Sequence, residues 1–301
     1  MISTSTTTVV VEDTDGTKSW TSIASTYDAA GFLVAKVTYL DSGSTISETF
    51  FGPQRLSQTI TDTSADAQPW ASRTTEWTWL GQKTTRTTVD DDGDTLIERY
   101  DVDSGKRIER VDVDSTDSHK WHCFSTLYDA TGKDRIGTEK VFDDGRVDTR
   151  TYDADTGTMT ARTIQDGADK FVWTTRTLTY DADTGRKTGR DILYDDGSRD
   201  TLVLQEGKRV SHTRFDGDDD AFEWVTLEKT YDSNGRLAQV EETRDDSDLI
   251  IRHFAGGELV GRTRYDNSGN EAWHVEQVTF DASGNVTETL HFDDSGTLLL
   301  L

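Results

Sequence analysis

Apolar and polar residues alternate along much of the chain with a period of two. In the segment 225–231, Val225, Leu227 and Tyr231 fall on one side, and threonine and glutamate residues fall on the other. The segment 33–39 has the same alternation. Successive side chains of a strand point to opposite faces, so this pattern predicts β-strands. No segment shows sustained helical periodicity, and we therefore expect an all-β protein.

Tryptophan recurs along the chain at intervals of 49 to 52 residues. The six regularly spaced residues are Trp20, Trp70, Trp121, Trp173, Trp224 and Trp273. Seven residues after each comes a second aromatic residue, at Tyr27, Trp77, Tyr128, Tyr180, Tyr231 and Phe280. A fixed period of this length is typical of repeat architectures. The sequence therefore predicts six quasi-repeats of about 51 residues, each starting near one of the six tryptophans.

A turn motif follows the second aromatic residue. In five units that residue is followed by Asp and, three or four positions later, by Gly, as in segment 231–235 (YDSNG). Asp can accept a backbone N–H and Gly adopts the left-handed conformation that such turns need. The second unit departs from the motif in segment 77–81 (WTWLG). Three further turn signals per unit predict four antiparallel strands in each unit.

The strand count suggests how the units combine. One predicted strand precedes Trp20 and three follow Trp273, so we expect the segment 1–19 to complete the last unit of a single repeat domain over residues 1–301. Two architectures fit: a closed six-bladed propeller-like ring, or a continuous sheet coiled as a spiral β-shell or solenoid. Apolar residues make up 33% of the chain and the mean hydropathy is −0.69, which favours a continuous sheet with one buried face.

The segments 230–237 (TYDSNGRL) and 180–186 (YDADTGR) resemble the YD repeats of the Rhs and teneurin type. In that family the repeats build a spiral β-shell, which in some members encloses a toxin. The resemblance covers most of the chain from about residue 20, and it implies a β-repeat scaffold in a surface or secreted setting. It carries over no catalytic residue. The chain departs from the family in its period near 51 and in the tryptophan of every unit.

The charge balance narrows the range of partners. With 32 basic and 57 acidic residues the net charge is −25, which opposes binding to nucleic acid and to anionic membranes and favours basic partners. No apolar window is long enough to span a membrane, and the first residues predict no conventional signal peptide. Cys123 is alone, so no disulfide can form within the chain.

Acidic clusters in the predicted turns are candidate calcium ligands, because calcium takes six to eight oxygen atoms. The residues are Asp90, Asp92, Asp94, Asp216, Asp218 and Asp220. None of these clusters fits the twelve-residue helix-loop-helix calcium loop. The alternative interpretation is that the same residues only form turns and a solvated acidic surface. Calcium is therefore the one cofactor that the sequence suggests.

Two tryptophans outside the regular pattern are candidate binding residues. An exposed aromatic side chain can stack on a carbohydrate, and Trp77 and Trp79 lie where the second unit breaks its turn motif. For the six regular tryptophans we expect core packing, because a repeat needs one large residue per unit to fill its core.

The function that these observations favour is a non-enzymatic scaffold for binding or assembly, with a protein or carbohydrate partner, secreted or on the cell surface. None of the nucleotide-binding, serine-hydrolase or zinc-protease motifs that we searched for occurs in the sequence. The alternative function is a propeller-type glycosidase or lyase, for which paired carboxylates cannot be singled out among 57 acidic residues. The alternative location is the cytoplasm of a salt-adapted cell.

Overall fold

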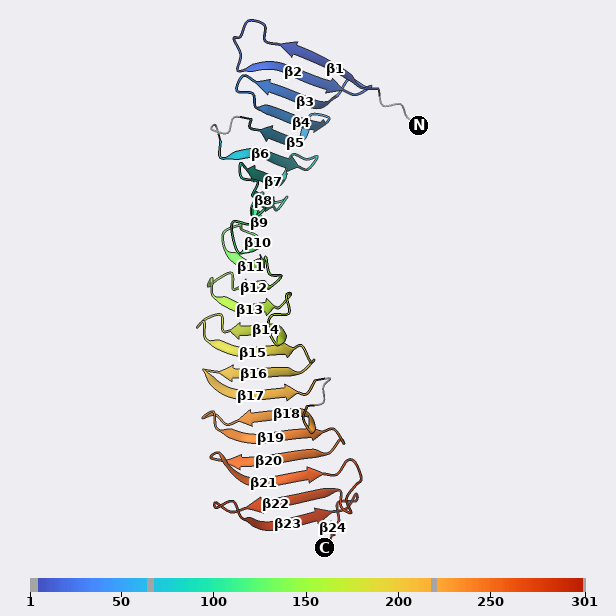
Figure 1. Cartoon of the computed structure of the whole chain (residues 1–301), viewed down its shortest axis with the longest axis vertical. Coiled ribbons are helices and arrows are strands. Elements are labelled where there is room, and N and C mark those ends of the chain that lie inside the picture. The colour runs from blue at the N-terminus through green and yellow to red at the C-terminus, as the bar shows by residue number, and fades with distance from the viewer. Residues whose placement is uncertain (1–4, 64–67, 218–220, 300–301) are drawn as a thin grey trace. The chain divides into compact units, whose positions relative to one another are not determined.

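The computed structural model describes residues 5–63, 68–217 and 221–299, which form β-strands joined by turns and loops (Figure 1). None of the described residues belongs to a helix, so none forms a helix that could cross a membrane. The strands of the first half are β1 (Thr7–Glu12), β2 (Trp20–Tyr27), β3 (Leu33–Leu40), β4 (Thr45–Phe51), β5 (Gln54–Thr61), β6 (Trp70–Trp77), β7 (Lys83–Asp90), β8 (Thr95–Tyr100), β9 (Arg107–Val113), β10 (Trp121–Tyr128), β11 (Arg135–Phe142) and β12 (Val147–Tyr152). Those of the second half are β13 (Met159–Gln165), β14 (Trp173–Tyr180), β15 (Lys187–Tyr194), β16 (Arg199–Gln205), β17 (Lys208–Phe215), β18 (Trp224–Tyr231), β19 (Leu237–Arg244), β20 (Leu249–Ala255), β21 (Glu258–Tyr265), β22 (Val275–Phe280), β23 (Val286–Phe292) and β24 (Leu298–Leu299).

The chain divides into two compact units. The first comprises Met1–Gly145 and Thr151–Gly157, and the second comprises Arg146–Arg150 and Thr158–Leu301. The division falls within β12, and each unit is described by itself below.

The predicted all-β repeat fold is confirmed. Five of the six regular tryptophans are the first residues of β2, β6, β10, β14 and β18, and each of these strands ends at the predicted second aromatic residue. Trp273 lies two residues before β22. Each repeat that begins at one of the first five tryptophans contains four strands, as the turn signals predicted.

Strands pair antiparallel with their neighbours in the chain. In the first unit the pairing runs from β1 to β11, and in the second it runs from β13 to β24. It continues across repeat boundaries, as between β5 and β6 and between β17 and β18. Separate propeller blades would interrupt these ladders, so the pairing within each unit favours the continuous sheet. β1 pairs with β2, and the completion of the last unit by segment 1–19 stays a prediction.

The turn after the second aromatic residue forms as the sequence suggests, with a glycine in the left-handed conformation. In segment 231–235 the Gly235 N–H donates to the Asp232 carbonyl at 2.8 Å, with a φ of 79° at the glycine. The second unit keeps this turn although Thr78 replaces the aspartate. Gly81 N–H donates to the Thr78 carbonyl at 2.9 Å, and Gln82 N–H donates to Thr78 Oγ1 at 3.2 Å. Only the side-chain acceptor has changed.

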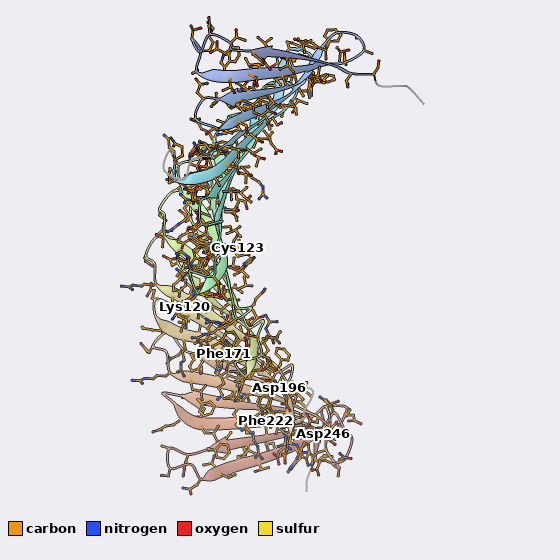
Figure 2. The ribbon with its side chains drawn as sticks, turned by 45° about the horizontal axis from the view of Figure 1, so that its top comes forward. Lys120, Cys123, Phe171, Asp196, Phe222 and Asp246 are labelled. Atoms are coloured by element: carbon orange, nitrogen blue, oxygen red, sulfur yellow. The ribbon has the colours of Figure 1, made fainter. Side chains whose placement is uncertain are left out.

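The two faces of the sheet differ in chemistry, and side chains project from both sides of the ribbon (Figure 2). Residues opposite one another in an antiparallel pair lie on the same face. One face, here the threonine face, carries hydrogen-bonded threonine pairs such as Thr59–Thr74 and Thr163–Thr177, with Oγ1 atoms 3.0 and 3.1 Å apart. Cross-strand pairs of this kind stabilise the sheet by roughly 0.2–1 kcal/mol each.

The other face, here the tryptophan face, holds the buried hydrophobic side chains, most of them in the second unit. Among the described residues, the hydrophobic side chains that are buried are Trp70, Ile192, Val240, Ile250, Trp273 and Val278. The strand register places the four aliphatic residues of this set on one face, opposite charged residues; Ile250, for example, pairs with Glu242 and Arg264. The core of the second unit therefore consists of rows of aliphatic side chains flanked by ion pairs.

Carboxylates on the tryptophan face are held by basic side chains. Glu242 Oε2 lies 2.8 Å from Arg252 Nη1, and its other oxygen lies 3.1 Å from Arg244 Nε. Asp200 is held in the same way by Arg190 at 2.7 Å and His212 at 2.9 Å. A buried charge costs less free energy when it is paired and hydrogen-bonded than when it has no partner. The candidate site described below departs from this charge pairing.

Candidate functional site: an acidic pocket beside Trp121

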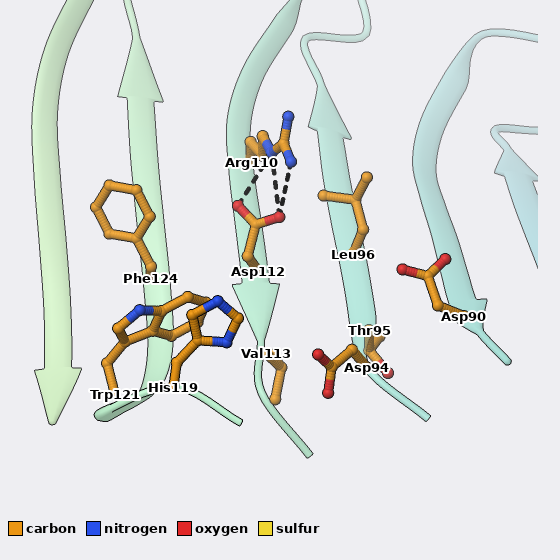
Figure 3. Close-up of a pocket in the computed structure, with 10 residues that line it drawn as sticks. All are labelled: Asp90, Asp94, Thr95, Leu96, Arg110, Asp112, Val113, His119, Trp121 and Phe124. Atoms are coloured by element: carbon orange, nitrogen blue, oxygen red, sulfur yellow. Dashed lines mark hydrogen bonds and ion pairs between the residues drawn. The ribbon is translucent and has the colours of Figure 1, made fainter. Parts of the chain in front are cut away.

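A pocket of about 280 Å³ lies in the first unit, between the β7–β8 turn and the β9–β10 loop (Figure 3). Its lining residues are Asp90, Asp94, Thr95, Leu96, Arg110, Asp112, Val113, His119, Trp121 and Phe124. Three of them are aspartates and three have aromatic rings. The imidazole of His119 lies against the indole of Trp121, with ring centroids 4.6 Å apart.

The Asp114 carboxylate, beside this pocket, organises the β9–β10 loop. It is buried, and it accepts hydrogen bonds from the backbone N–H groups of His119 at 2.6 Å and Ser118 at 3.1 Å. Burial alone would raise the pKa of Asp114, but these hydrogen bonds outweigh it and lower the pKa to about 2. Asp114 is therefore ionised at neutral pH and serves as a loop cap.

Asp94 joins the β7–β8 turn to the same loop. Its Oδ1 accepts hydrogen bonds from Ser115 N–H at 2.9 Å and from Thr116 N–H at 3.3 Å. Among the described residues, Oδ2 of Asp94 has no hydrogen bond. One carboxylate oxygen is thus structural, and the other is available to a ligand.

Asp90 and Asp112 add further negative charge. Burial, followed by the carboxylates of Asp92, Asp94 and Asp91, raises the pKa of Asp90, and the neighbouring Arg73 does not offset this. In the part of the chain that the structure describes, no hydrogen bond or ion pair engages the Asp90 side chain. Asp112 is paired with Arg110, whose Nη2 lies 2.8 Å from Asp112 Oδ1.

The ligand atoms of Asp94, Asp114 and His119 lie within 4.8 Å of one another. Two carboxylates and an imidazole are suitable ligands for a divalent cation, although calcium takes six to eight oxygens. Of the calcium ligands predicted from sequence, Asp90 and Asp94 come together at this pocket, while Asp92 accepts the Asp94 N–H at 3.1 Å within the turn. Calcium binding here stays a prediction.

The remaining predicted metal ligands lie in the second unit. Asp216 accepts the backbone N–H of Phe222 at 3.0 Å, so its carboxylate caps the loop before Trp224. Asp218 and Asp220 lie outside the described residues.

The two predicted aromatic binding residues lie in different surroundings. Trp77 is half-buried, and the guanidinium carbon of Arg55 lies 4.3 Å from its ring centroid. Trp79 lies in the next turn and is 64% exposed. Neither lines the acidic pocket, and binding by these two residues stays a prediction.

A recurring aspartate before each tryptophan was missed by the sequence analysis. It lies seven or eight residues before the tryptophan, at Asp13, Asp62, Asp114, Asp166, Asp216 and Asp266. In each case its backbone N–H donates to the carbonyl of the residue after the tryptophan, as from Asp114 to His122 at 2.9 Å. Aligning the six units on tryptophan would have revealed this spacing.

The repeat that contains Trp273 has a counterpart of the pocket, built from the β19–β20 turn and the β21–β22 loop. Asp266 N–H donates to the His274 carbonyl at 2.8 Å, as Asp114 N–H does to His122. Arg244 N–H donates to the Asp248 carbonyl at 2.8 Å, as Asp90 N–H does to Asp94 at the same distance. These backbone contacts match Asp94 with Asp248, Asp114 with Asp266, Trp121 with Trp273, Asp90 with Arg244, and Asp112 with Arg264.

The counterpart differs in having two arginines where the pocket has aspartates. Arg264 reaches back to the fully buried Asp248, with its Nη2 2.8 Å from Asp248 Oδ2. Its guanidinium carbon also lies 5.3 Å from the Trp273 ring centroid. The same geometry therefore encloses a guanidinium in one repeat and an excess of carboxylates in the other.

No family model and no curated protein matches the chain. Among solved structures, the chain is similar to the Tc holotoxin pore of Photorhabdus luminescens, with 14% identity over 90% of this chain, a TM-score of 0.17, and 18% of that chain covered. It is also similar to BamB from Moraxella catarrhalis, with 13% identity over 96% of this chain and 98% of that chain and a TM-score of 0.18. The chain is also similar to Chaetomium thermophilum Sqt1 bound to the N-terminus of ribosomal protein L10. The identity is 10% over 92% of this chain and 83% of that chain, with a TM-score of 0.16. The chain therefore spans less than a fifth of the length of the first of these, and its description as a β-repeat protein rests on its own strand order and pairing.

Proposed function

We propose that this chain is a non-enzymatic β-repeat scaffold that binds a partner at the acidic pocket of its tryptophan face. The observation that carries the proposal is the set of carboxylates in this pocket, where Arg110 pairs with Asp112 but no ion pair engages Asp90 or Asp94 among the described residues, whereas Glu242 and Asp200 are each held by two basic side chains. An unbalanced charge in a preformed hollow costs stability, and a ligand of opposite charge recovers it.

The state of two carboxylates, Asp114 and Asp112, supports binding over hydrolysis. A glycosidase needs one carboxyl group that is protonated near its working pH. Asp114, with a pKa of about 2, is ionised there, and its oxygens are engaged by the loop. Asp112 is engaged by Arg110. The Asp90 carboxyl, with its raised pKa, is the acid that a test for turnover must examine.

The resemblance to YD repeats supports a secreted or cell-surface location for this scaffold. The net charge of −25 supports a basic partner over nucleic acid, because opposite charge steers association.

The test is an assay of purified protein for reducing ends released from a panel of neutral and acidic polysaccharides. We expect no turnover above the buffer blank. Turnover that disappears in Asp90→Asn but persists in the control variant Asp103→Asn, which lies in the β8–β9 turn at the other end of β8, would overturn the scaffold in favour of a carbohydrate-active enzyme.

A further inference from the structure

We propose that the acidic pocket beside Trp121 binds the guanidinium group of a single arginine side chain presented by a protein partner. This inference deepens the proposed binding function and rests on it.

The strongest argument is that the chain already contains a filled version of this pocket. In the repeat of Trp273, the Arg264 guanidinium donates to Asp248 from Nε at 3.2 Å and from Nη2 at 2.8 Å. Its Nη1 lies 3.4 Å from Oε1 of Glu271, the counterpart of His119. The carboxylate, the aromatic ring and the loop acceptor together recognise a planar cation.

A second repeat places arginine at the same position. Arg214 stands two residues before the loop aspartate Asp216, as Arg264 stands before Asp266. Its guanidinium carbon lies 5.6 Å from the ring centroid of Trp224 and 5.5 Å from that of Phe222. A guanidinium beside the repeat tryptophan is therefore a recurring arrangement in this protein.

In the acidic pocket the position of that arginine is occupied by Asp112. The substitution removes the internal cation and adds a carboxylate, while Asp94 keeps the place of Asp248. Arg110 engages Asp112, and Lys140 lies 5.9 Å from the Trp121 ring centroid, so neither takes the place of Arg264 on Asp94. Asp94 Oδ2 remains as an acceptor in the pocket, and the Asp90 carboxylate adds negative charge from β7, which β8 and β9 separate from the strand of Trp121.

The size of the pocket fits one side chain. Its volume of about 280 Å³ lies just below the range of roughly 300–1,000 Å³ that is typical of sites for drug-sized ligands. This volume accommodates one side chain, and the arrangement around Arg264 in the Trp273 repeat indicates that its end group is a planar cation. A protein partner supplies such a group without further chemistry, and the acidic scaffold attracts basic partners over a distance of about a Debye length.

The test follows the indole N–H signal of Trp121 in two-dimensional ¹⁵N NMR spectra of the full chain. The signal is assigned with Trp121→Phe, and the probes are N-acetyl-arginine methylamide and its citrulline analogue, which has the same shape without the charge. We expect a saturable shift with the arginine probe in the millimolar range and little shift with citrulline, because a charge-assisted hydrogen bond is worth about tenfold or more in affinity.

Two variants locate the site. Asp112→Arg supplies the internal guanidinium found in the Trp273 repeat, and we expect it to weaken the arginine probe at least tenfold. Asp103→Arg makes the same change of charge in the same unit, in the exposed β8–β9 turn, and should bind the probe as the wild type does. If Asp112→Arg fails to fold, Asp94→Asn is the second variant, and weaker binding is again expected.

The outcomes that overturn the proposal are distinct. An unchanged Trp121 signal, equal shifts with both probes, or full binding by a folded Asp112→Arg variant each contradicts a guanidinium site. A saturating shift with micromolar calcium or zinc that excludes the arginine probe would instead make the pocket a metal site. None of these results produces polysaccharide turnover, so failure here remains distinguishable from failure of the scaffold function.

Discussion

The pocket beside Trp121 and its counterpart beside Trp273 have the same backbone but opposite charge balance. Around Trp273, Arg264 pairs with Asp248 and Arg244 pairs with Glu242, while the buried Asp266 is held by hydrogen bonds within its loop, as Asp114 is. Around Trp121 the corresponding positions are Asp112 and Asp90. The backbone hydrogen bonds of the two loops and turns agree within 0.1 Å in the pairs compared above.

This difference shows how a repeat protein can create a site without changing its fold. The loop aspartate and the tryptophan hold the backbone in both repeats, so the two positions that face the pocket, Asp90 and Asp112 with their counterparts Arg244 and Arg264, are free to vary in charge. Where they are arginine, the repeat is closed by its own ion pair; where they are aspartate, a pocket remains. The predictions below test this comparison.

The largest effect is expected for Arg264→Ala. This change leaves Asp248, which is 0% exposed, without its guanidinium partner. We expect the free energy of unfolding to fall by about 2 kcal/mol, because a buried carboxylate without its partner is costly. Urea unfolding at pH 7, followed by tryptophan fluorescence, measures the change.

The control for this variant is Arg199→Ala. The Arg199 side chain is 54% exposed and pairs with Asp191, so its loss should cost less than about 1 kcal/mol. If the free energy of unfolding fell equally in the two variants, the Arg264 ion pair would contribute no more to stability than a surface pair.

A smaller effect of opposite sign is expected for Asp112→Arg. A guanidinium at this position faces Asp94 as Arg264 faces Asp248, so we expect the free energy of unfolding at pH 7 to rise by about 1 kcal/mol. Asp103→Arg is the matched control for charge, and a gain of the same size there would show that only the net charge matters.

The pH dependence of stability should reveal the loop aspartates. The pKa of Asp114 in the folded protein, about 2, is below its ordinary value of 3.8. The unfolded state therefore binds protons first as the pH falls, and the stabilisation from Asp114 is present above about pH 4 and lost between pH 4 and 2. Burial raises the pKa of Asp166, but hydrogen bonds from Phe171, Ala168 and Lys170 lower it overall.

Melting temperatures measured from pH 5 to pH 2 test this expectation. Asp114→Asn and Asp166→Asn should each lose less melting temperature across the window than the wild type, because neither has the titrating carboxylate. If the melting temperature of both variants fell with pH as steeply as that of the wild type, these residues would not act as ionised loop caps.

The smallest effect is expected from divalent cations. Asp94, Asp114 and His119 supply three ligands, fewer than calcium prefers. We expect calcium and magnesium, at matched ionic strength and relative to chelator, to raise the melting temperature by the same one or two degrees, by screening the charge of −25. A rise that is specific to calcium and lost in Asp94→Asn would instead support the calcium site predicted from sequence.

Much of the fold could be predicted because its determinants are local. The alternation of segment 225–231 marks a strand, and the aspartate and glycine of segment 231–235 form a turn through contacts between residues close in the chain. The departure of segment 77–81 from the motif was misleading, because the Thr78 hydroxyl accepts the hydrogen bond that an aspartate would accept. Even there the spacing of the turn was a better guide than the residue type.

The candidate site could be predicted only in part. Asp90 and Asp94 were singled out as acidic turn residues, but Asp114 and His119 lie about twenty residues further along and meet Asp94 only because β8 and β9 pair. The recurring loop aspartate escaped notice because its distance from the tryptophan varies between seven and eight residues.

The sequence by itself determined the all-β class, the six repeats, the four strands of a repeat and the turns, because these depend on side-chain alternation and on local hydrogen bonds. Only the tertiary structure decided that the ladders run on between repeats, that the faces differ, and which carboxylates lack a cation. Those properties depend on which residues of neighbouring strands stand opposite one another, and the register of Asp112 against Leu96 and of Arg264 against Ile250 is set by long-range pairing.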